Sequence, residues 1–132
     1  MTQNVQTNDI ISDMLTRLRN AIHAKKEVVA LINTKAVLEV LNVLSNYGFV
    51  GRYEIDEETG NITVHLKVDN QYKINELKRV SRPGLRKYVG VKDVKQIKGG
   101  RGIAVLSTSQ GIISDEKARK DRAGGEYLFY VW

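Results

Sequence analysis

Residues 27–68 read EVVALINTKAVLEVLNVLSNYGFVGRYEIDEETGNITVHLKV and contain signals for a strand, a helix and a hairpin in close succession. Residues 27–32 are short, apolar and rich in β-branched side chains, which favours a strand. Asn33 or Thr34 is placed to cap a helix whose apolar side chains recur at helical spacing, and Gly48 is expected to end it. Residues 49–55 and 62–68 then predict two strands, joined by the loop D-E-E-T-G-N as a hairpin.

The residues before this stretch predict one more helix. Asp9 is placed to cap it, and its apolar side chains follow helical spacing (Ile10, Ile11, Met14, Leu15, Leu18, Ala21 and Ile22). Residues 1–69 are therefore expected to form an N-terminal α/β domain in the order helix, strand, helix, strand, strand. The seam with the next domain is expected at residues 69–71.

The second half, residues 70–132, is punctuated by glycines and has shorter segments. Strands are expected at residues 80–81, 86–89, 103–107 and 126–131. Ser114 is placed to cap one short helix that runs to about Asp121. The second domain is therefore expected to be mainly β, and the fold class of the whole chain is α+β.

Composition excludes several classes of protein. The 132 residues include no cysteine, which removes disulfide frameworks, thiolate metal sites and cysteine nucleophiles. No apolar run is long enough to cross a bilayer, and the polar start MTQNVQTND does not resemble a signal peptide. A cytoplasmic protein without a membrane partner is expected.

Charge is distributed unevenly along the chain. Residues 1–68 carry 7 basic and 8 acidic residues, a net charge of −1, whereas residues 69–132 carry 14 and 7, a net charge of +7. Ten of the basic residues lie between 73 and 101, with only Glu76 and Asp93 against them. A field of one sign attracts polyanions, so nucleic acid is the natural partner, although a basic surface that is simply solvated would give the same composition.

Signals for catalysis are weak. His23 and His65 have no metal-ligand spacing nearby, and the acidic residues 56–58 fit a solvated turn better than an acid–base pair. The segment G-G-R-G (99–102) lacks the lysine and hydroxyl of a phosphate loop and precedes a strand, so a tight turn explains it better. A phosphoester-processing enzyme built on residues 99–102 and 107–109 therefore remains only a remote alternative. No metal, cofactor or small-molecule substrate is expected.

Two other segments are more informative. Ser107, Thr108 and Ser109 place three consecutive hydroxyls before a glycine turn, where they can bond to phosphates, 2′-hydroxyls or base edges. An ordinary Ser/Thr-rich turn is the competing explanation. In RVSRPGLRKY (79–88), Pro-Gly predicts a type II bend that projects cationic side chains, and Tyr88 offers a stacking face for an unpaired base.

Four segments together resemble the bacterial small-subunit ribosomal proteins of the universal family numbered eight. They are DMLTRLRNA (13–21), RVSRPGLRKY (79–88), GGRGIAVLSTSQGIISDEKAR (99–119) and GGEYLFYVW (124–132). The resemblance covers essentially the whole chain.

The resemblance implies a two-domain structural protein of the 30S subunit. Such a protein binds the central domain of 16S rRNA at a partly unpaired helix and helps to assemble the platform. Its implied neighbours are ribosomal proteins five and twelve. The site residues that we assign from the matching positions and from the basic segment are Ser107, Thr108, Ser109, Tyr88, Gly124, Gly125, Glu126, Arg82, Arg86, Arg79, Lys35 and Asp9.

The chain departs from the family pattern at three places. Asp9-Ile10 replaces the usual Asp-Pro, and Ile32-Asn33-Thr34-Lys35 lacks the usual proline, which weakens the assignment of Asp9 and Lys35. Arg101 stands between two glycines where an apolar residue is usual. Some relatives also repress translation of their own operon by binding an mRNA site that mimics the rRNA site, and this alternative would use the same surface.

Overall fold

The computed structural model describes residues 3–132, with side chains from Ile10 onward. The chain divides into two compact units, Met1–Ile74 (unit 1) and Asn75–Trp132 (unit 2). Together they give an α+β protein with a mainly β second half that contains one short α-helix, which confirms the expected fold class.

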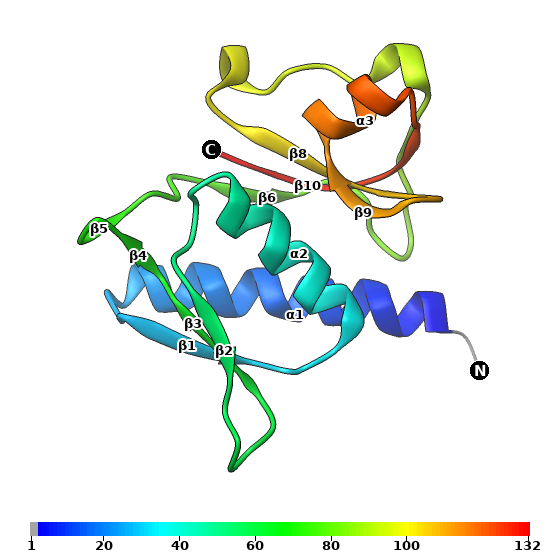
Figure 1. The fold of residues 1–132 in the computed structure, drawn as a ribbon. Coiled ribbons are helices and arrows are strands. Elements are labelled where there is room, and N and C mark those ends of the chain that lie inside the picture. Colours follow the sequence, from blue (N-terminus) through cyan, green and yellow to red (C-terminus); the bar gives the residue numbers. More distant parts are fainter. Residues whose placement is uncertain (1–2) are drawn as a thin grey trace. The chain divides into compact units, whose positions relative to one another are not determined.

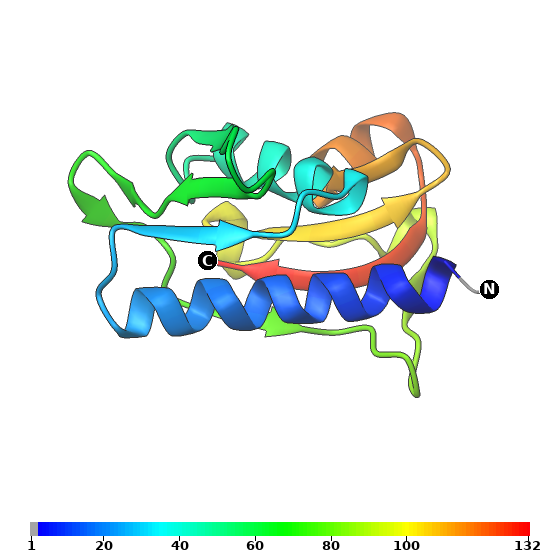
Figure 2. The same cartoon turned by 90° about the horizontal axis from the view of Figure 1, so that it is seen from below.

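Unit 1 combines two helices with a three-stranded antiparallel sheet and a small hairpin. Its elements are α1 (Gln3–His23), β1 (Val28–Leu31), α2 (Lys35–Asn46), β2 (Tyr53–Ile55), β3 (Ile62–His65), β4 (Lys67–Val68) and β5 (Gln71–Tyr72). The sheet order is β1-β3-β2, and β4 pairs with β5. Figures 1 and 2 show α1 running alongside β1.

The helix α2 forms where the sequence predicts it. The Thr34 hydroxyl accepts a hydrogen bond from the Val37 amide at 3.2 Å, which satisfies one of the free donors at the helix start. One apolar face of the helix is buried (Val37, Val40, Leu41, Val43 and Leu44). Gly48 follows with φ +77°, a conformation that glycine adopts without strain, and the helix ends there as expected.

The β2–β3 hairpin also matches the pattern. Ile62 and Val64 are fully buried and alternate with the half-buried Thr63 and His65, so one face of β3 belongs to the core. The strand expected over residues 49–55 is shorter, because β2 begins only at Tyr53. Before it the chain passes close to β3 and β4. A Cβ on Gly51 would lie 2.8 Å from the Lys67 carbonyl oxygen.

The start of the first helix differs from the expectation. Because α1 begins at Gln3, Asp9 lies inside the helix and is not its N-terminal cap. Its side chain lies outside the described part of the structure. Asp69 and Asn70 form the β4–β5 turn and both have positive φ, as a two-residue type I′ turn requires, while Gln71 begins β5.

Unit 2 is a five-stranded antiparallel sheet with one short α-helix. Its elements are β6 (Leu77–Arg79), β7 (Tyr88–Val89), the 3₁₀ turns η1 (Val91–Asp93) and η2 (Lys98–Gly100), β8 (Ile103–Thr108), β9 (Gly111–Ser114), α3 (Asp115–Asp121) and β10 (Gly125–Val131). The order is β6-β10-β8-β9, and β7 also pairs with β10. The strand β10 therefore holds three other strands.

One apolar cluster of unit 2 lies between the sheet and α3, which covers β8 and β9 in Figure 1. Its buried members are Val94, Ala104, Leu106, Ile113 and Ala118. The Tyr127 side chain packs against this cluster, and burial, with the nearby Asp115 charge as a second cause, raises the pKa of its phenol to about 12.

Polar contacts fix α3 to the sheet. The Ser114 hydroxyl accepts from the Lys117 amide at 3.2 Å and caps the helix, as predicted. The Asp115 carboxylate is buried, and it accepts from the Ala104 amide at 2.9 Å and from Arg119 at 2.6 Å.

Two strand expectations in unit 2 are wrong. The strand β9 was not expected, and it forms because the glycine turn returns the chain beside β8. The strand expected at residues 80–81 lies earlier, as β6, which ends at Arg79. The Val80 and Ser81 amides still donate to the carbonyls of Leu128 and Tyr127, so the chain stays beside β10 for two more residues. No helix among the described residues is long and apolar enough to cross a membrane.

Candidate nucleic-acid interface

Three of the predicted site residues lie in one row across the sheet of unit 2. Glu126 on β10 is the register partner of Tyr88 on β7 and of Ser107 on β8. Directly opposed residues of antiparallel strands place their side chains on the same face of a sheet. Residues that are up to 38 positions apart in the sequence therefore share one surface, and at its β7 end the Tyr88 side chain is 69% exposed.

The glycine pair beside this row lets three strands approach closely. A Cβ on Gly125 would lie 2.2 Å from the Ser107 carbonyl oxygen, and one on Gly124 would lie 2.6 Å from that of Val89. Any larger side chain would push β10 away from β8 or from the end of β7. Both glycines thus set the spacing of the row, which is a structural role that the sequence did not reveal.

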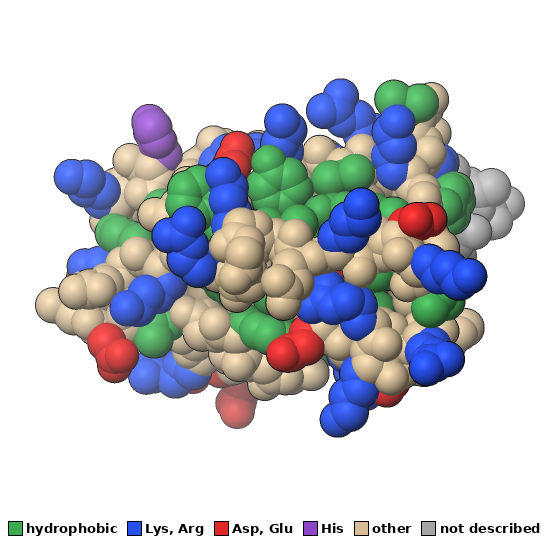
Figure 3. All heavy atoms as spheres, turned by 90° about the horizontal axis from the view of Figure 1, so that it is seen from above, with side chains coloured by type: hydrophobic (Ala, Val, Ile, Leu, Met, Phe, Trp, Pro, Cys, Tyr) green, Lys and Arg blue, Asp and Glu red, His purple; other side chains and the backbone are tan. Residues whose placement is uncertain are grey.

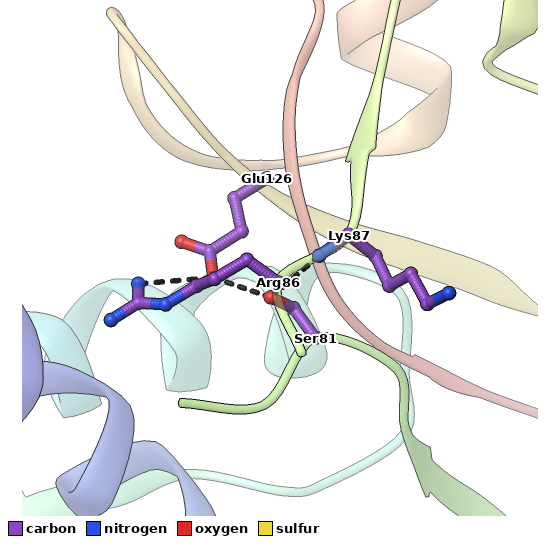
Figure 4. Close-up of polar contacts among 4 residues, drawn as sticks. All are labelled: Ser81, Arg86, Lys87 and Glu126. Carbon is purple, nitrogen blue, oxygen red and sulfur yellow. Dashed lines mark hydrogen bonds and ion pairs between the residues drawn. The ribbon is translucent and has the colours of Figure 1, made fainter. Parts of the chain in front are cut away.

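The Glu126 carboxylate belongs to a hydrogen-bond network with the segment that follows β6. Its Oε2 accepts from the Ser81 hydroxyl at 2.5 Å and from Arg86 Nη1 at 3.4 Å (Figure 4). The Ser81 oxygen in turn accepts from the Lys87 amide at 3.1 Å. Glu126 therefore partly neutralises Arg86, which explains how a carboxylate is accommodated in a basic region.

The basic segment forms a tight hairpin. Arg82 and Leu85 exchange two backbone hydrogen bonds of 3.0 and 3.1 Å, with Pro83 and Gly84 between them. Gly84 is not in the positive-φ region that a type II turn requires, so the expected bend type is wrong. Proline fits the first central position of a type I turn equally well, and this is why the sequence could not separate the two. Arg82 is exposed, whereas Arg86 is half-buried against Glu126.

The three hydroxyls at the end of β8 have different surroundings. The Thr108 hydroxyl donates to the Gly111 carbonyl and accepts from the Gln110 amide, both at 3.0 Å, and so it holds the β8–β9 turn. Ser107 is half-buried in the row, and Ser109 is exposed at the tip of the turn. The turn explanation therefore applies to Thr108, whereas an RNA contact by Ser107 and Ser109 stays a prediction.

The remaining site residues lie elsewhere. Arg79 is half-buried on β6, opposite Phe129 of β10. Lys35 is exposed at the start of α2 in unit 1, and Asp9 is also in that unit. Figure 3 shows one face of the molecule, on which Lys and Arg side chains predominate over Asp and Glu.

The histidine and hydroxyl candidates for catalysis belong to different units. His65 bonds to Glu54 at 2.9 Å, and this hydrogen bond is the main reason that the pKa of the Glu54 carboxyl lies below its usual value. Both side chains are on the surface of unit 1, whereas Ser107–Ser109 are in unit 2. Among the described residues, no group of three His, Asp or Glu side chains could hold a metal ion.

Comparison with known proteins agrees with the sequence resemblance. The family model described as ribosomal protein S8 matches residues 9–132. The chain belongs to this family. It is therefore a structural, non-enzymatic ribosomal protein of the small subunit, located in the ribosome.

Individual relatives match over nearly their whole lengths. The small ribosomal subunit protein uS8c of Guillardia theta is 47% identical, over 96% of this chain and 99% of the relative. The uS8 proteins of Porphyromonas gingivalis and Caldicellulosiruptor bescii are 45% and 44% identical, each over 94% of this chain and over 98% and 97% of their own lengths.

One residue of the interface was missed by sequence reasoning. Ser81 was quoted within the basic segment, but no role was assigned to it, and the structure places it at the centre of the Glu126 network. A serine between two arginines gives no signal of burial. Only the pairing of the segment with β10 shows that its side chain is completely enclosed.

Proposed function

We propose that this member of the ribosomal protein S8 family binds the central domain of 16S rRNA in the cytoplasmic ribosome and helps to assemble the platform of the subunit. In this proposal residues 1–69 form an N-terminal α/β domain and residues 70–132 form the RNA-binding domain. The observation that carries it is the row of Tyr88, Glu126 and Ser107 beside a basic hairpin.

Charge supplies the attraction for RNA. Residues 69–132 carry a net charge of +7, whereas residues 1–68 carry −1. Exposed cations such as Arg82 bind phosphates regardless of sequence, and this part of the affinity falls as salt concentration rises. The basic surface alone would therefore bind any RNA.

The row of Tyr88, Glu126 and Ser107 allows the protein to discriminate between RNAs. The exposed Tyr88 ring offers a stacking face to an unpaired base, and the hydroxyls of Ser107 and Ser109 can bond to a 2′-hydroxyl or a base edge. The Gly124–Gly125 pair supports the row by letting β10 lie close to β8 and to the end of β7. The stacking and hydroxyl contacts favour a distorted, partly unpaired RNA helix over a regular duplex.

The remaining members of the proposed interface contribute less. Arg86 and Arg79 lie half-buried and support the hairpin and the sheet, while Thr108 holds its turn. Lys35 and Asp9 are proposed to approach a second RNA segment. Neighbouring ribosomal proteins, with proteins five and twelve as candidates, complete the set of partners.

The test is binding to a transcript of the 16S central domain and to a scrambled duplex of equal length, measured across a salt series. We expect a preference for the transcript that persists as salt rises. Replacing Ser107 and Ser109 together by Ala should reduce that preference about tenfold while leaving duplex binding unchanged. Equal affinities for both RNAs, falling together with salt, would contradict the proposal.

A matched control comes from unit 1. The Ser45 hydroxyl donates to the Gly51 carbonyl at 3.4 Å and lies outside the row. Ser45→Ala removes a hydroxyl of the same kind, and the preference for the transcript should not change.

Repression of the protein's own mRNA is the second candidate function. The same row would read a leader RNA that copies the rRNA site. Competition between the leader and the central-domain transcript for one binding site is the expected result. Simultaneous binding of both RNAs would contradict a shared surface.

A further inference from the structure

The geometry points to Ser81 as a positioning residue that determines specificity, because it orients Glu126 so that the free carboxylate oxygen accepts a hydrogen bond from the amino group of an unpaired base. This inference rests on the proposed function and adds to it a residue and a chemical class of ligand. Exocyclic amino groups of adenine, cytosine and guanine are the donors that a carboxylate can read.

Ser81 is placed to fix two segments at once. Its side chain is 0% exposed, and its hydroxyl donates to Glu126 Oε2 at 2.5 Å while accepting from the Lys87 amide at 3.1 Å. A bond of this length to a carboxylate is of the strong, charge-assisted kind. Its backbone amide also donates to the Tyr127 carbonyl at 2.9 Å, so the serine itself is anchored to β10.

The second carboxylate oxygen remains available. All described contacts of the Glu126 side chain use Oε2, and in Figure 4 the other oxygen, Oε1, points away from Ser81. Oε1 is not among the buried unpaired polar atoms, and the side chain keeps 13% of its surface exposed. One oxygen is therefore used internally while the other reaches solvent as an acceptor.

The neighbours of Glu126 define where a base would lie. Glu126 stands between Tyr88 and Ser107 in the row. A base stacked on the Tyr88 ring can direct its edge toward the middle of the row, where a carboxylate accepts from an amino group but repels a carbonyl or phosphate oxygen. Glu126 thus contributes discrimination, and orientation by Ser81 is what makes it effective.

Loss of the Ser81 hydroxyl should release the carboxylate. Arg86, at 3.4 Å, would then be its only described partner, and the Arg86 side chain is itself 27% exposed. The carboxylate would follow a partly mobile cation and spend less time in the position that faces the row. Affinity for the specific RNA should fall, whereas electrostatic binding to any duplex should not.

The experiment measures the ratio of affinities for the 16S central-domain transcript and the scrambled duplex. Ser81→Ala should lower this ratio about tenfold with duplex affinity unchanged. Ser81→Cys has nearly the same volume but supplies only a weak hydrogen-bond donor, so it should lower the ratio by a similar factor. This second variant keeps the inference testable if the alanine variant fails to fold.

A double-mutant cycle separates positioning from a general structural role. In a Glu126→Gln background, Ser81→Ala should have no further effect on the ratio, because Ser81 acts through the carboxylate. An undiminished loss in that background, or an unchanged ratio in the single variant, would overturn the inference. A protein without any preference for the transcript would instead overturn the proposed function itself.

Ser114 provides the matched control. It is another buried serine of unit 2, 3% exposed, and its hydroxyl also accepts from a backbone amide, that of Lys117. Ser114→Ala should lower the melting temperature and leave the ratio unchanged. A tenfold drop in the ratio for this variant as well would show that any buried hydroxyl has the effect, and the role of Ser81 would be rejected.

Discussion

In unit 1 the structure follows from apolar side chains, whereas unit 2 combines an apolar core with closely packed glycines and buried polar groups. The apolar faces of α2 and β3 lie in the core of unit 1, and helical or alternating spacing is visible in the sequence. Unit 2 contains the buried Ser81, Ser114 and Asp115, each hydrogen-bonded to a distant segment or to a backbone amide.

This difference between the two units bears on where the proposed binding surface lies. Apolar packing tolerates substitutions of similar volume, because it depends on shape and area. A row of side chains proposed to meet one RNA surface needs fixed directions, and hydrogen bonds and close backbone contacts provide them. The unit with the net positive charge is also the unit built by directional contacts.

The largest expected effect comes from the glycine that spaces the row. Gly125→Ala places a methyl group 2.2 Å from the Ser107 carbonyl oxygen, so β10 and β8 must separate. We expect a loss of about 3 kcal/mol in the free energy of unfolding, measured by urea denaturation, and loss of specific RNA binding.

Gly84→Ala is the control for that change. Gly84 has no atom within 4 Å of a new Cβ and does not need positive φ, so stability should change by less than about 0.5 kcal/mol. If Gly125→Ala and Gly84→Ala were equally stable, close packing of β10 would not explain the difference between unit 2 and unit 1.

A smaller effect is expected at the two helix caps, one in each unit. Thr34→Ala and Ser114→Ala each remove a side-chain acceptor for a helix amide and should each cost about 1 kcal/mol in denaturation experiments. Hydrogen exchange should show the loss in α2 for the first variant and in α3 for the second. Equal loss of protection in both units after either change would mean that they unfold as one.

The last effect appears only at high pH and should be confined to unit 2. The pKa of Tyr127 is raised to about 12 from the ordinary value of 10, so the folded state favours the protonated phenol. The stabilisation is complete below pH 10 and is lost as the pH rises toward 12. Tyr127→Phe should flatten this part of the stability curve, and an unchanged alkaline transition would assign it to other groups.

The sequence was sufficient where the determining contacts are local. The Thr34 cap, the Gly48 stop and the alternation of Ile62 and Val64 are all read within a few residues, and the structure confirms them. The sequence was insufficient where the two partners of a contact are far apart along the chain. The bond between Ser81 and Glu126 joins residues 45 positions apart, and no periodicity reports it.

The misses have the same cause. The bend at Gly84 was assigned from Pro-Gly alone, although proline fits both turn types, and β9 exists only because the chain returns beside β8. For the candidate site, the residue types alone predicted that hydroxyls, cations and an aromatic ring would form it. Their alignment in one row, and the different task of Thr108, required the strand register.

The position of β10 has a consequence for how the protein folds during its own synthesis. This strand holds β6, β7 and β8, yet it is made after all of them. Unit 1 has its complete set of strands and helices once residue 74 has left the translating ribosome, and it can fold at that point. The sheet of unit 2 must wait until residues 125–131 emerge, so the proposed RNA-binding surface stays unformed until β10 has left the ribosome.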